Sequence, residues 1–116
     1  MSVNYYVSGP GIEPAAPGDP GLHIGKHSGG LEYLFRGHPE LNLQTVAQWR
    51  EFVNQPGRQI IGEHHAPESA TEFFAMATRR PADPLAQDQI PIRSRGHRYR
   101  RDMDARGVPF LDTEFC

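Results

Sequence analysis

The chain has 116 residues, which is the length of one domain. Only 37% of the residues are hydrophobic, and 11 are Pro and 12 are Gly, so the composition indicates long loops around a modest core. The chain contains no apolar run of about 18 residues, which argues against a membrane span, and no signal-peptide pattern, which argues against secretion. Its one cysteine, Cys116, can form neither an internal disulfide nor a thiolate zinc cluster. We therefore expect a cytoplasmic protein. Its net charge of −2 is uneven, because residues 93–106 hold six arginines and two aspartates.

The first third of the chain predicts strands. Residues 3–8 (VNYYVS) alternate and are rich in β-formers, whereas residues 9–21 hold enough Pro and Gly to predict a loop. The runs 22–26 and 31–38 predict a hairpin whose turn is Gly29-Gly30, since both glycines can adopt the positive φ of a type I′ turn. In this register His23 opposes Arg36.

The register sorts the hairpin side chains onto two faces, because successive residues of a strand point to opposite sides. The apolar face would carry Leu22, Ile24, Tyr33 and Phe35. The polar face would carry His23, His27, Glu32, Leu34, Arg36 and His38.

Two helices follow, each with a capping box. Thr45 and Gln48 begin the first, within residues 43–57, and its apolar stripe consists of Val46, Trp49, Phe52 and Val53. Ser69 and Glu72 begin the second, within residues 67–81, and its stripe consists of Ala70, Phe73, Phe74 and Ala77. Pro56-Gly57 and Pro81 end the two helices.

The remaining segments predict further strands. Residues 58–65 predict a short strand, residues 81–92 a Pro-interrupted linker, and residues 96–102 and 108–115 a hairpin through 103–107. This order has no regular β-α-β alternation. It predicts an α+β fold, a single small domain over residues 1–116, with a mostly antiparallel sheet of hairpins and two α-helices packed on one face.

The stretch GLHIGKHSGG is not a P-loop, because Pro20 occupies the place of the first glycine and His27 that of the hydroxyl residue. Its neighbourhood supplies the first candidate binding residues: His23, Lys26, His27, Glu32, Arg36 and His38. These are either a solvated sheet surface or a surface for an anionic ligand. The histidines lack the specific spacing of a zinc motif, so neither a metal site nor a cofactor is predicted.

The basic segment 93–106 supplies a second candidate patch, made of Arg98, Tyr99, Arg100 and Arg101. Arginines interleaved with an aromatic ring can neutralise phosphates and stack on a base. The alternative is that these arginines pair with the chain's own carboxylates or with an acidic partner. No serine lies in a nucleophile-elbow context and no other catalytic motif is present, so the sequence favours a non-enzymatic protein.

The stretch NYYVSG…GLHIGKHSGGLEYLFRGHPE resembles small, mostly uncharacterised proteins encoded by phages and prophages, which share a Leu-His-Ile-Gly-Lys-Ser-x-Gly-like motif. The resemblance is close over residues 22–30 and extends in outline to most of the chain. Some of those proteins have a Cys-x-x-Cys pair before the motif, which this chain lacks. The resemblance implies a protein of the host cytoplasm, monomeric or dimeric, that binds a host protein to modulate or inhibit it in host takeover or anti-defence. The alternative is a binder of nucleic acid or of a phosphate-bearing signalling nucleotide.

Overall fold

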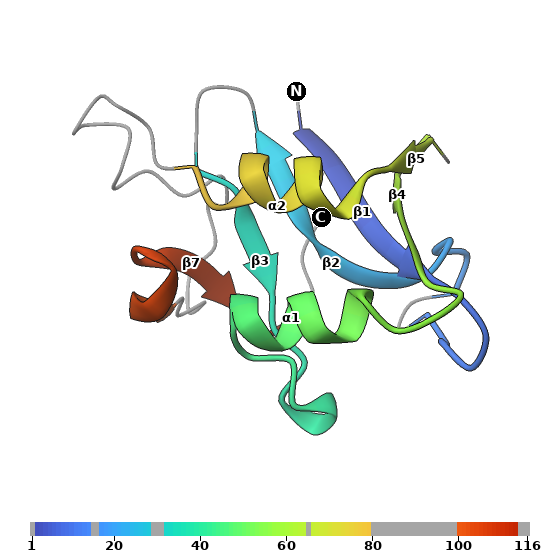
Figure 1. Ribbon diagram of the computed structural model, residues 1–116, viewed down its shortest axis with the longest axis horizontal. Coiled ribbons are helices and arrows are strands. Elements are labelled where there is room, and N and C mark those ends of the chain that lie inside the picture. The colour runs from blue at the N-terminus through green and yellow to red at the C-terminus, as the bar shows by residue number, and fades with distance from the viewer. Residues whose placement is uncertain (1, 15–16, 29–31, 65, 80–99, 114–116) are drawn as a thin grey trace.

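A computed structural model describes residues 2–14, 17–28, 32–64, 66–79 and 100–113 of the chain. Seven strands form one sheet in the order β5-β4-β1-β2-β3-β7-β6 (Figure 1). The strands are β1 (Ser2–Ser8), β2 (Leu22–Ser28), β3 (Leu34–Arg36), β4 (Gln59–Gly62), β5 (Pro67–Glu68), β6 (Arg100–Asp102) and β7 (Val108–Leu111). The helices are α1 (Val46–Val53) and α2 (Ala70–Ala77), with the 3-10 turns η1 (Pro39–Leu41) and η2 (Met103–Ala105).

This architecture is the predicted α+β class, with both helices on one face of a mostly antiparallel sheet (Figure 1). The strand at 3–8, the strand within 58–65 and the hairpin of β6 and β7 are confirmed. The short strand β5 and the parallel pairing of β3 with β7 were not predicted. The linker at 81–92 and the turn Gly29-Gly30 lie outside the described residues.

Both helices begin at the predicted capping residues. The Thr45 hydroxyl accepts a hydrogen bond from the Gln48 amide (3.1 Å), and the Gln48 side chain accepts one from the Gln44 amide (2.7 Å). The Ser69 hydroxyl likewise accepts from the Glu72 amide (3.4 Å). Each bond satisfies an amide that has no partner within its helix. Within the described residues, no helix is long and apolar enough to cross a membrane.

The core lies between the helices and one face of the sheet. Phe35 of β3 stacks on Phe110 of β7 with ring centroids 4.9 Å apart, and Phe73 of α2 meets the Tyr33 ring edge-on at 5.4 Å. Trp49 of α1 is fully buried and donates its indole hydrogen bond to the Arg36 carbonyl (3.0 Å). Aromatic contacts therefore join β3 to β7, and a buried hydrogen bond joins α1 to β3.

A β-bulge changes the faces of β2. Tyr5 pairs with Gly25 and Tyr6 with His23, so Ile24 is the extra residue. Gly25 has φ +152°, and a Cβ at this position would collide with the Leu34 carbonyl oxygen and the Tyr33 ring, so only glycine fits.

Beyond the bulge the alternation is inverted. The His27 ring lies against Tyr33, with the ring centroids 6.5 Å apart, on the helix side of the sheet. Lys26 lies on the His23 side instead, where its charge lowers the pKa of His23. The sequence prediction placed His27 on the polar face with His23, because a regular alternation has no extra residue.

The predicted hairpin register is wrong by one residue. Gly25 pairs with Phe35 and Lys26 with Leu34, so His23 does not oppose Arg36. The prediction assumed a two-residue turn and an unbroken β2, whereas β2 bulges and β3 is also held in parallel register by β7, through Phe35 and Phe110. The predicted apolar face is nevertheless confirmed, since all four of its residues lie in the core: Leu22, Ile24, Tyr33 and Phe35.

Candidate functional site

The predicted histidine-rich surface is buried. His23, Lys26, Glu32, Arg36 and His38 have exposed fractions of 8% or less, and His27 is half-buried. The expectation of a solvated sheet face is therefore wrong. It assumed a sheet with one wet face, but β2 and β3 are central strands and β3 is buried on both faces.

The two buried histidines belong to an internal hydrogen-bond network. The His23 ring donates from Nε2 to the Asn4 side-chain oxygen (2.9 Å) and lies 5.3 Å from the Tyr6 ring. His38 donates from Nε2 to the His23 carbonyl (2.8 Å), and its ring meets Trp49 edge-on at 5.8 Å. These contacts tie β1, β2 and α1 together, so they are contacts of the fold.

Burial gives His23 an unusual pKa. Desolvation, followed by the nearby charge of Arg36, lowers the pKa of His23 from 6.5 to about 4. Burial also lowers the pKa of His38. The unfolded chain therefore binds protons at a higher pH than the folded chain does, so acid favours unfolding between the two pKa values.

We expect the free energy of unfolding to fall by about 2 kcal/mol between pH 7.5 and pH 5 through His23 alone, because only the unfolded state is protonated in this interval. The test is urea unfolding at both pH values for the wild type and for His23→Asn. In His23→Asn, the free energy of unfolding should fall by about 2 kcal/mol less over this pH interval than it does in the wild type. In His64→Asn, which removes an exposed histidine, it should fall as much as in the wild type. Equal pH dependence of His23→Asn and the wild type would contradict the expectation.

The described half of the arginine patch forms internal ion pairs. Arg100 makes a two-pronged ion pair with Asp112 (2.8 and 3.0 Å), donates to the Gln44 carbonyl (2.5 Å) and lies over the Phe110 ring at 4.8 Å. Arg101 donates to Glu32 (3.1 Å) and to the Gly107 carbonyl (2.8 Å).

These contacts agree with the alternative that the arginines pair with the chain's own carboxylates. Both guanidinium groups hold the C-terminal hairpin against the rest of the sheet and against the start of α1. The other two residues of the patch, Arg98 and Tyr99, lie outside the described residues. Within residues 2–14, 17–28, 32–64, 66–79 and 100–113, no group of three His, Cys, Asp or Glu side chains is placed to hold a metal ion.

An exposed leucine marks a different candidate site. Leu41 is 49% exposed at the end of η1, and in the described part of the chain only Met103 is a comparably exposed large apolar side chain. Asn42 follows with a left-handed backbone (φ 57°), and the His38 and Leu43 backbones pair across the turn. This closed turn presents Leu41 outward. Pro39 and Asn42 in the sequence HPELNL were the signal for such a turn, but sequence reasoning missed it.

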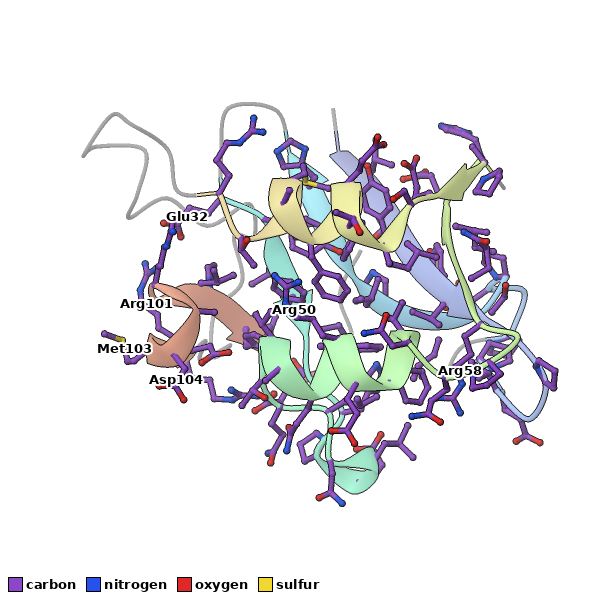
Figure 2. All side chains as sticks on the ribbon, viewed as in Figure 1. Glu32, Arg50, Arg58, Arg101, Met103 and Asp104 are labelled. Carbon is purple, nitrogen blue, oxygen red and sulfur yellow. The ribbon has the colours of Figure 1, made fainter. Side chains whose placement is uncertain are left out.

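Leu41 lies between two hollows of about 340 and 440 Å³. Both hollows are lined by Leu41, Phe52 of α1 and Arg58, and the larger one continues over Ile12. The Arg58 guanidinium lies over the Phe52 ring at 4.0 Å and donates to the Phe52 carbonyl (2.8 Å), so it covers the ring. Figure 2 shows Arg58 beyond the C-terminal end of α1.

Carboxylates surround this apolar centre. Glu13, Glu40 and Glu51 are exposed and line one hollow or the other, whereas Arg58 is the one basic residue that lines them. We define the Leu41 face as the apolar residues Ile12, Leu41 and Phe52 with their charged neighbours Glu13, Glu40, Glu51 and Arg58. Its charge balance is acidic, with three carboxylates and one guanidinium group.

Comparison of the chain with models of protein families, with curated proteins and with solved structures finds no match.

Proposed function

We propose that this protein is a non-enzymatic binding protein whose Leu41 face docks on a partner protein and modulates it. The observation on which this rests is the half-exposed Leu41 between two hollows that share Phe52 and Arg58. An apolar side chain with hollows on both sides can interlock with a partner, and contacts of this kind dominate the energy of protein interfaces. Phe52 and Arg58 add the aromatic and guanidinium groups that are enriched in interfaces.

The charge around the face determines the kind of partner. Three carboxylates surround the apolar centre, and the single arginine is already bonded to a backbone carbonyl. A partner segment with an apolar side chain flanked by Lys or Arg complements this pattern. The resemblance to phage and prophage proteins suggests that the partner is a host protein and that the outcome is host takeover or anti-defence.

The test uses the wild type, Leu41→Asp and Met103→Asp as bait in a bacterial lysate treated with nuclease. Leu41→Asp should lose a discrete protein that the wild type retains, and Met103→Asp, the matched exposed control, should retain it. With the purified partner, we expect Leu41→Asp to weaken binding by about 30-fold, which is the loss typical of a buried anchor residue. Glu13→Lys with Glu51→Lys should slow association and reverse its salt dependence, because the face then repels a basic partner.

Three outcomes would refute the proposal. The first is equal retention of the partner by wild type and Leu41→Asp. The second is equal loss in Leu41→Asp and Met103→Asp. The third is material that nuclease removes entirely, which would favour nucleic acid as the ligand. Circular dichroism of each variant separates loss of binding from loss of fold.

A further inference from the structure

A third hollow lies on the opposite side of α1 from Leu41, between the start of α1, the end of α2 and the turn that joins β6 to β7. Its volume is about 530 Å³, which is within the range of small-molecule sites. Figure 2 shows Arg50 rising from α1 towards α2 and Asp104 on the β6–β7 turn. The hollow is lined by Thr45, Val46, Ala47, Arg50, Ala75, Thr78, Arg79, Asp102, Asp104, Ala105 and Arg106.

Three arginines from three separate elements converge on this hollow. Arg50 comes from α1, Arg79 follows α2, and Arg106 closes the turn after η2. The Arg50 guanidinium lies over the Phe74 ring at 4.7 Å, which fixes its direction. Across the residues that the structure describes, neither Arg50 nor Arg79 forms an ion pair with a carboxylate, and both are exposed. Their charges therefore remain available to a ligand.

The buried carboxylate of the hollow is already engaged. Asp102 is 7% exposed and accepts hydrogen bonds from the amides of Val46 (2.8 Å) and Asp104 (3.1 Å), so it caps α1 and η2. Among the described residues that line the hollow, only Asp104 places an exposed carboxylate at the mouth. The exposed guanidinium groups of Arg50 and Arg79 outnumber that carboxylate, which favours an anionic ligand.

The shape of the lining indicates what the anion is attached to. Ala47, Ala75 and Ala105 give the hollow small apolar side chains beside the guanidinium groups. A planar ring can lie on such a surface, while guanidinium groups bind phosphate oxygens in pairs. We infer that this hollow, the Arg50 hollow, binds a nucleoside phosphate, with the phosphates at Arg50 and Arg79 and the base on the alanine surface. The inference does not depend on the Leu41 face.

The test is isothermal titration of the full chain with three probes: ATP, tripolyphosphate and adenosine. ATP should bind most tightly, tripolyphosphate less tightly and adenosine weakly, and raising the salt concentration should weaken the two anions. Arg50→Gln with Arg79→Gln should reduce ATP affinity by about tenfold or more, since each lost charge-assisted contact contributes to binding. Asp104→Asn should strengthen tripolyphosphate binding, because it removes a carboxylate from the mouth.

The matched control is Arg58→Gln, which removes an arginine from the Leu41 face and should leave ATP binding unchanged. The inference is overturned if no probe binds at millimolar concentration, if adenosine binds as tightly as ATP, or if Arg58→Gln weakens ATP binding as much as the double variant does. A single-stranded oligonucleotide that binds much more tightly than ATP would also overturn it, in favour of nucleic acid. A negative result in the ATP titration would leave the proposal for the Leu41 face unaffected, and a negative result in the lysate experiment would leave the inference about the Arg50 hollow unaffected.

Discussion

Replacing Trp49 by Ala should lower the free energy of unfolding by about 4 kcal/mol. The indole is fully buried, meets the rings of His38 and Phe52 edge-on, and donates to the Arg36 carbonyl. Its removal leaves a large cavity between α1 and β3 and a buried carbonyl without its donor. Urea unfolding followed by circular dichroism measures the loss.

Trp49→Phe separates packing from hydrogen bonding. The variant retains an aromatic ring but has no N–H for the Arg36 carbonyl, so we expect a loss of about 2 kcal/mol. A Trp49→Ala variant less than about 1 kcal/mol below the wild type would contradict the packing described for α1. It would mean that α1 is not held on the sheet by this side chain.

Replacing Arg101 by Ala should cost about 3 kcal/mol of stability. Glu32 is 2% exposed and accepts from Arg101 at 3.1 Å (Figure 2). Without the guanidinium, the buried Glu32 carboxylate loses the positive charge of Arg101. The Gly107 carbonyl also loses this hydrogen-bond donor. Chemical unfolding of the purified variant gives the value.

A double-mutant cycle tests whether Glu32 and Arg101 act as a pair. Glu32→Gln with Arg101→Ala should be less unstable than the sum of the two single variants, because the double variant has no carboxylate at position 32 left to compensate. Arg50→Ala, which removes an exposed arginine, should lose less than about 1 kcal/mol. Additive losses in the cycle would show that the two residues stabilise the fold separately.

The parts of the fold that depend on local chemistry could be predicted from the sequence. Thr45 and Ser69 cap α1 and α2 as expected, because a cap depends on residues within one turn of it. The alternation of apolar residues also identified which side chains of β2 and β3 enter the core. These signals lie within short windows of the chain.

The parts that depend on distant contacts could not be predicted. The parallel partner of β3 is β7, more than seventy residues further along the chain, and this pairing makes β3 a central strand. Burial of His23 and Arg36 follows from that position, and no local pattern indicates it. The need for glycine at position 25, beside the bulge, comes from the close approach of the Tyr33 ring and the Leu34 carbonyl. The Leu41 face and the Arg50 hollow combine segments whose proximity is set by the fold alone.

The position of β7 determines the order in which the sheet can be completed. β7 is the last of the strands in the described residues, yet it lies inside the sheet between β3 and β6. During synthesis, β1 to β5 and both helices leave the ribosome while the hydrogen-bonding edge of β3 still has no neighbour. An open edge invites pairing with another chain, so the nascent protein is exposed to aggregation until its C-terminal hairpin docks. The hydrogen bond from Arg100 to the Gln44 carbonyl and the ion pair of Arg101 with Glu32 hold that hairpin against the rest of the fold. We therefore expect these two arginines to protect the newly made chain as well as the finished one.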